Sequence, residues 1–113
     1  MGNTKILRTD DFEREVLQAE GLVLVDFFAP WCPPCRRLEP ELESIAAQLG
    51  DGIKIFKVDV DQDEPLSLQY NVQQIPNMTF FRNGKVVDQH VGMLAKRDIL
   101  SRIASLSEQV GAK

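Results

Sequence analysis

The only two cysteines in the chain, Cys32 and Cys35, are separated by two prolines. They follow an apolar run from Leu22 to Phe28 and open a segment of helical periodicity. A cysteine at a helix N-terminus is biased toward the thiolate, the form that attacks disulfides, because the helix dipole and free N–H groups favour negative charge there. Cys35 is within reach of the same turn and could resolve a mixed disulfide formed at Cys32. The spacing therefore predicts thiol–disulfide exchange.

Three other uses of the cysteine pair are less well supported. A structural zinc site needs four ligands, and this chain offers only two cysteines and one histidine, His90. A purely structural disulfide would close so small a loop that it would hardly restrict the unfolded chain. An inert buried pair would not explain the position between a strand and a helix, where ligands and chemistry gather in open α/β sheets.

Length and composition predict one soluble globular domain spanning residues 1–113, with 43% hydrophobic and 27% charged residues. The net charge of −4 argues against a nucleic-acid partner. No run approaches the roughly 18 apolar residues of a membrane span, and residues 1–10 lack the apolar core of a signal peptide. We therefore expect a cytoplasmic protein with no membrane partner.

Hydrophobic periodicity and turn signals divide the chain into alternating strands and helices. The order is β, α, β, α, β, α, β, β, α, which implies a mixed sheet with helices on both sides. The expected strands are residues 4–8, 22–28, 53–60, 78–81 and 85–91, and the expected helices are residues 10–21, 33–49, 63–70 and 96–109.

Local signals predict where several of these elements begin and end. Asp10, with Glu13 three positions on, is the expected N-cap of the first helix, and Asp63 is the expected cap of the third. Asn71 is suited to the left-handed exit from that third helix. Asn83-Gly84 predicts a tight hairpin between the last two strands.

Asp26 is the one charged residue in the apolar run from Leu22 to Phe28. A carboxylate in an apolar strand is costly unless it is used or paired, and desolvation should raise its pKa. Asp26 is therefore a candidate for proton transfer, although a core aspartate satisfied by hydrogen bonds is the alternative.

Several separated motifs together resemble the thioredoxin family across essentially the whole chain. They are the run Val23-Leu24-Val25-Asp26-Phe27-Phe28-Ala29-Pro30-Trp31-Cys32-Pro33-Pro34-Cys35, then Lys57, Ile75-Pro76, Asn83-Gly84-Lys85 and Val91-Gly92. The resemblance implies the α/β thioredoxin fold, with a central mixed sheet of about five strands flanked by about four helices.

The resemblance also implies roles for four residues. Cys32 would be the exposed nucleophile, and the more buried Cys35 would resolve the mixed disulfide. Asp26 would exchange a proton with the resolving cysteine. Lys57 would lie near Asp26 and moderate its charge, although by sequence alone it could equally be a solvated strand residue.

A substrate-docking surface around Cys32 is implied in the same way. Pro76 would be the family's cis-proline, which turns the backbone N–H and C=O of Ile75 outward to pair with an extended substrate segment. Trp31, Ile75, Pro76, Gly92 and Met93 would form the apolar surface. Trp31 could instead belong to the core, but its place in a loop beside Cys32 favours exposure.

The implied function is reduction of disulfide-containing substrate proteins by dithiol–disulfide exchange, with a thioredoxin reductase as electron donor. No cofactor is expected besides the redox-active disulfide, no metal is expected, and the expected form is a monomer. One alternative is a more oxidising or specialised thiol–disulfide exchanger. Another is a non-catalytic binding module on the same fold, which the presence of Cys32, Cys35, Asp26 and Pro76 together argues against.

The sequence departs from the family at the residues between the cysteines, where Pro33-Pro34 replaces the usual Gly-Pro. Proline suits the first turn of a helix but has no N–H, so the donors near Cys32 reduce mainly to that of Cys35. Pro33 and Pro34 are therefore the expected redox-tuning residues. Ala95 likewise stands where a serine often caps the last helix.

We predict that Pro33→Gly measurably changes the reduction potential of the cysteine pair. The substitution returns an N–H to the turn beside the thiolate and makes that turn less stiff, and these two effects need not cancel. Equilibration of both proteins in glutathione buffers measures the potentials. Equal potentials would contradict the prediction.

Overall fold

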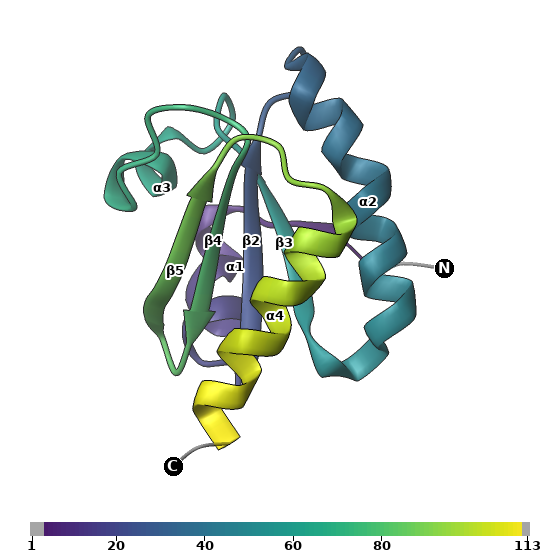
Figure 1. Ribbon diagram of the computed structural model, residues 1–113. Helices are drawn as coiled ribbons and strands as arrows, with labels where there is room; N and C mark the ends of the chain where they lie inside the picture. The colour runs from purple at the N-terminus through teal and green to yellow at the C-terminus, as the bar shows by residue number, and fades with distance from the viewer. Residues whose placement is uncertain (1–3, 112–113) are drawn as a thin grey trace.

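The central strand of the protein is β2 (Leu22–Phe28), which lies in the middle of a five-stranded sheet of order β1-β3-β2-β4-β5 (Figure 1). The computed structural model describes residues 4–111. The other strands are β1 (Lys5–Ile6), β3 (Lys54–Asp59), β4 (Asn77–Arg82) and β5 (Lys85–Val91). β2 pairs parallel with β3 and antiparallel with β4, and β5 pairs antiparallel with β4. The predicted mixed sheet is confirmed.

Four α-helices cover the two faces of this sheet, as predicted (Figure 1). They are α1 (Thr9–Phe12), α2 (Pro33–Leu49), α3 (Glu64–Gln69) and α4 (Lys96–Gly111), with a π-helical turn at Glu13–Leu17 and a 3-10 turn at Gly50–Gly52. α2 and α4 pack on one face, whereas α1 and α3 lie against the other. Pro40 lies inside α2, which stays a single helix.

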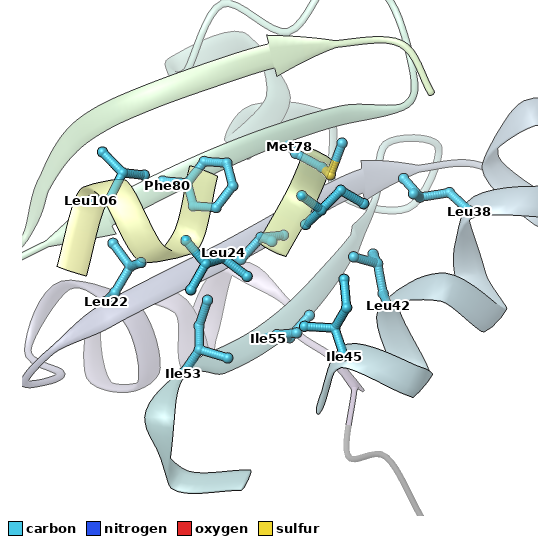
Figure 2. Packing of buried hydrophobic residues seen from close by; sticks show 12 residues of the cluster. Leu22, Leu24, Leu38, Leu42, Ile45, Ile53, Ile55, Met78, Phe80 and Leu106 are labelled. Carbon is cyan, nitrogen blue, oxygen red and sulfur yellow. The ribbon is translucent and has the colours of Figure 1, made fainter. Parts of the chain in front are cut away.

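The alternation of side chains along β2 divides the hydrophobic core into two layers. Leu22 and Leu24 pack with residues of α2 and α4, as Figure 2 shows. Val23, Val25 and Phe27 point to the other layer, which contains residues of α1 and α3. Since Asp26 follows Leu22 and Leu24 at a period of two, its side chain is directed toward α2. The fold therefore places this carboxyl beneath the helix that begins with the cysteines.

Two predicted turns are confirmed by their backbone angles. Asn83 and Gly84, between β4 and β5, have φ values of 54° and 79°, as a two-residue hairpin turn requires. A Cβ atom on Gly84 would lie 2.9 Å from the carbonyl oxygen of Leu17, so the turn also needs glycine for its close approach to the first helical segment. Asn71, after α3, has a φ of 59°.

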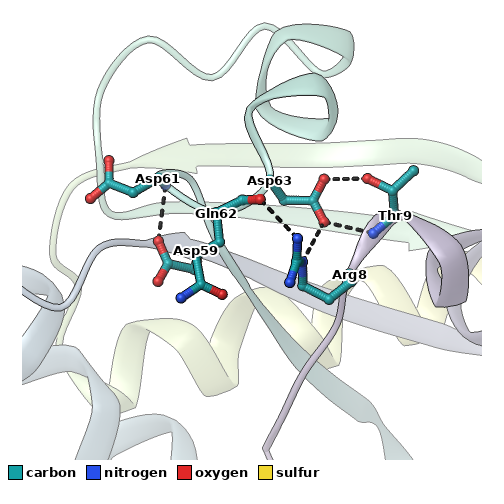
Figure 3. Close-up of polar contacts among 6 residues, drawn as sticks. All are labelled: Arg8, Thr9, Asp59, Asp61, Gln62 and Asp63. Carbon is teal, nitrogen blue, oxygen red and sulfur yellow. Dashed lines mark hydrogen bonds and ion pairs between the residues drawn. The ribbon is translucent and has the colours of Figure 1, made fainter.

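The predicted cap of the first helix is wrong. The helix begins at Thr9, and Asp10 lies inside its first turn. Asp63, which precedes α3, accepts hydrogen bonds from the N–H of Thr9 at 2.6 Å and from the Thr9 hydroxyl, and its Oδ2 lies 3.3 Å from Nε of Arg8 (Figure 3). Asp63 makes no side-chain cap to α3 itself. A buried carboxylate from a distant loop thus replaces the expected local cap.

We predict that Ala95→Ser stabilises the protein by about 1 kcal/mol. Ala95 precedes α4, and its carbonyl accepts from the N–H of Asp98 at 2.9 Å and of Ile99 at 3.1 Å. A serine hydroxyl at this position could accept from a free N–H of the first turn. The same substitution at the exposed Ala104, inside α4, is the matched control and should be slightly destabilising. Thermal unfolding measures both, and an unchanged or lower melting temperature for Ala95→Ser would contradict the prediction.

Candidate active site

Cys32 and Cys35 form a disulfide at the N-terminus of α2, with their Cα atoms 5.2 Å apart. Cys32 is the N-cap residue, and its Sγ accepts a hydrogen bond from the N–H of Cys35 at 3.3 Å. Pro33 and Pro34 occupy the first helical positions and have no N–H to offer. In the disulfide form, the backbone donor to Cys32 Sγ is thus the N–H of Cys35.

The expected contrast in exposure between the two cysteines is not present in the disulfide form. Each residue is only 3% exposed. Ala29 is buried with them, and Phe28, Val60 and Ile75 pack against this small cluster. The surroundings do differ, because Cys35 lines a cavity that Cys32 does not reach.

That cavity has a volume of about 440 Å³ and lies between α2 and the strands β2 and β3. Cys35 and Glu39 line it from α2, Asp26 from β2, and Lys57 from β3. Alternation along the strands and the four-residue spacing along the helix direct all four side chains into the same space. The fold therefore brings a cysteine, two carboxyls and an ammonium group together.

The carboxyl of Asp26 is almost completely buried, with 1% of the residue exposed. Its Oδ1 atom has no hydrogen-bond partner among residues 4–111. Burial raises the pKa of Asp26 to about 7; the charge of Lys57 lowers it and that of Glu39 raises it further. The alternative of a core aspartate satisfied by hydrogen bonds is thus not supported, and a carboxyl with this pKa has both protonation states available near neutral pH.

Lys57 is buried rather than solvated, with 7% of the residue exposed. It is the register partner of Asp26 across β2 and β3. Its ammonium forms an ion pair with Glu39 and lies 5.1 Å from the ring centroid of Phe28. The interpretation of Lys57 as a solvated strand residue is therefore wrong.

Glu39 is the residue of this site that the sequence analysis missed. A signal was present, because Glu39 is four positions after Cys35 in a predicted helix and so shares its face. Its partner, however, comes from β3, and nothing local in the sequence indicates that pairing.

Of the residues expected at the docking surface, some pack beside the disulfide and others are exposed to solvent. Ile75 packs against the disulfide cluster, the Ile75–Pro76 peptide bond is cis as the resemblance implied, and the N–H of Gly92 donates to the carbonyl of Pro76 at 2.8 Å. Trp31 and Met93 are 65% and 38% exposed. The core alternative for Trp31 is therefore wrong; its indole Nε1 donates instead to Asp61 at 2.6 Å.

Among residues 4–107, whose side chains the structure describes, no three His, Cys, Asp or Glu side chains gather as metal ligands would. None of the helices within residues 4–111 is long and apolar enough to cross a membrane. The single histidine, His90, has its Nδ1 3.3 Å from Nη2 of Arg102.

Comparison with known proteins agrees with this geometry. The profile of the thioredoxin family matches residues 3–105. Thioredoxin C-2 of Corynebacterium nephridii is 39% identical over 96% of this chain and 98% of its own length. Thioredoxin of Bacillus subtilis is 38% identical over 80% of this chain and 88% of its own length.

A solved structure gives the same result. The crystal structure of Malassezia sympodialis thioredoxin superimposes with a TM-score of 0.84 at 29% identity, covering 95% of this chain and 93% of that one. The chain therefore belongs to the thioredoxin family and is a thiol–disulfide oxidoreductase of the protein-disulfide reductase type.

Proposed function

We propose that this protein reduces disulfides in other proteins, with Cys32 as the nucleophile and Cys35 as the resolving thiol. The observation that carries this assignment is the position of the disulfide at the N-terminus of α2. Of its two cysteines, only Cys35 lines the cavity that Asp26 also lines. The N-cap position favours a thiolate at Cys32, and the cavity supplies a proton acceptor to Cys35.

The proposed reaction has two exchange steps. The Cys32 thiolate attacks a substrate disulfide, forming a Cys32–substrate disulfide and releasing one substrate thiolate, which takes up a proton. The Cys35 thiol then gives its proton to the Asp26 carboxylate, and the resulting thiolate attacks Sγ of Cys32. This forms the Cys32–Cys35 bond and releases the second substrate thiolate. The substrate gains two electrons, and the cysteine pair loses them.

Asp26 is suited to this proton transfer because its pKa lies near neutrality. As a carboxylate it accepts the proton of Cys35, and in the reverse direction it returns a proton to the Cys35 thiolate. Lys57 moderates its charge from the neighbouring strand.

The docking surface and the partners complete the proposal. Trp31, Ile75, Pro76, Gly92 and Met93 would contact the substrate around the disulfide. The oxidised pair would be recharged by a thioredoxin reductase, with no cofactor in this chain other than the disulfide. We place this electron carrier in the cytoplasm, because a reducing compartment keeps its cysteines as the dithiol. We further propose that it acts as a monomer.

Reduction of insulin with dithiothreitol, followed by turbidity, tests the activity. The wild-type protein should accelerate precipitation, and Cys32→Ser and Cys35→Ser should each abolish the acceleration. Cys35→Ser should also accumulate mixed disulfides with cellular proteins, because Cys32 can attack but nothing resolves the product. Cys32→Ser is the matched control and should trap none. If Cys35→Ser traps no protein either, the chain is a binding module rather than a reductase.

We also predict that Asp26→Asn changes how stability depends on pH. The folded-state pKa of Asp26, about 7, lies above its unfolded value, so between those two values the folded state holds a proton that the unfolded state has lost. The wild-type protein therefore loses stability through this group as pH rises to about 7, by an amount on the order of 4 kcal/mol for about three pH units.

Denaturant unfolding of the oxidised proteins near pH 4 and pH 8.5 measures the effect. The free energy of unfolding of Asp26→Asn, relative to that of the wild-type protein, should be larger near pH 8.5 than near pH 4. The same pH dependence in both proteins would show that burial does not perturb the Asp26 carboxyl.

A further inference from the structure

Glu39 lies at the rim of the cavity that contains Asp26 and Cys35. It follows Cys35 by one helical turn on α2, and both side chains line the cavity. Asp26 and Lys57 face them from paired positions on β2 and β3. Arg36 on α2 and Asp59 on β3 are the other charged residues that line this space. Asp59 accepts a hydrogen bond from the N–H of Asp61 at 2.9 Å, so that carboxylate already has a local partner.

The ammonium of Lys57 is paired with only one of the two nearby carboxyls. It forms an ion pair with Glu39 and, among the described residues, none with Asp26, although Asp26 is its register partner. The Lys57 side chain is 9% exposed and that of Glu39 is 50% exposed. A buried ammonium needs a charged or hydrogen-bonding partner. Without the carboxylate of Glu39, Asp26 would be the unpartnered acceptor in the same cavity.

We propose that Glu39 is a positioning residue for the proton transfer between Asp26 and Cys35, and that its carboxylate holds the Lys57 ammonium away from Asp26. The inference rests on the proton-transfer role proposed above for Asp26. When Glu39 is removed, the ammonium turns toward Asp26 and stabilises the ionised carboxylate. Asp26 then becomes a weaker base toward the Cys35 thiol.

The electrostatics of the cavity act in the same direction. The negative charge of Glu39 raises the pKa of Asp26, and the positive charge of Lys57 lowers it. Glu39 therefore opposes the effect of Lys57 both through its own charge and by holding the ammonium in place. These two contributions can be separated by experiment.

Titration of the Asp26 carboxyl, followed by its carbon-13 chemical shift in the oxidised protein, is the first test, because disulfide-bonded cysteines do not titrate. Glu39→Gln should lower the Asp26 midpoint by on the order of one pH unit. Glu41→Gln, on the same helix, removes the same charge outside the cavity and should leave the midpoint unchanged. An unmoved midpoint in Glu39→Gln overturns the inference. Glu39 is half exposed, so this variant should fold.

The same titration in a Lys57→Met background separates positioning from direct charge. If Glu39 acts by holding the ammonium, Glu39→Gln should shift the midpoint by less than half as much once Lys57 is absent. An equal shift in both backgrounds overturns the positioning role. Circular dichroism checks folding, and Lys57→Gln replaces Lys57→Met in the comparison if the latter unfolds.

The pH profile of insulin reduction connects the titration to the reaction. The midpoint of its acidic limb should fall in Glu39→Gln by the shift seen for Asp26, and should stay in place in Glu41→Gln. A shifted Asp26 midpoint with an unchanged profile overturns the role in proton transfer. The titration does not require the protein to reduce a substrate, so it can fail or succeed separately from the activity assay. If the Asp26 midpoint shifts as expected but the protein reduces no disulfide, the proposed function is contradicted. If the protein is active but the Asp26 midpoint does not move, only the inference about Glu39 is overturned.

Discussion

The carboxyl of Asp26 is held in the strand on which the rest of the sheet is built, between β3 and β4 and beneath α2. Its burial favours the protonated form and raises the pKa of Asp26 to about 7, so that the protonated form is present near neutral pH beside the ionised one. The surrounding core must therefore be stable enough to keep a costly group in place. Two layers of buried aliphatic and aromatic side chains supply that stability.

Helix α2 places the two cysteines close to the buried carboxyl of Asp26. Its buried face, with Leu38, Leu42 and Ile45, anchors the helix on the sheet (Figure 2). Its first turn carries both cysteines, and the next turn carries Glu39 to the cavity rim. Because one rigid helix holds all of these groups, the distance between the disulfide and the buried carboxyl is fixed by core packing rather than by a flexible loop.

The sequence predicts best where the determining interactions are local. The bounds of β2, α2 and β5 agree with prediction because long apolar patterns and the Asn83-Gly84 turn define them. The predicted start of α1 was wrong because the carboxylate that accepts from its first N–H, that of Asp63, lies 54 residues away from Thr9 in the sequence. Glu39 was missed for the same reason: its ion pair with Lys57 forms only when α2 packs on β3.

In the proposed mechanism, the thiolate of Cys32 and the proton of Cys35 depend on different parts of the site. The thiolate of Cys32 depends on the first turn of α2, where Pro33 and Pro34 leave Cys35 as the N–H donor to its sulfur. The proposed acceptor of the Cys35 proton, Asp26, lines the same cavity as Cys35. Substitutions between the cysteines therefore act mainly on the energy of the thiolate, whereas substitutions around the cavity act on the proton. Under the proposed mechanism, the two sets of residues therefore act on the same disulfide through different sulfur atoms.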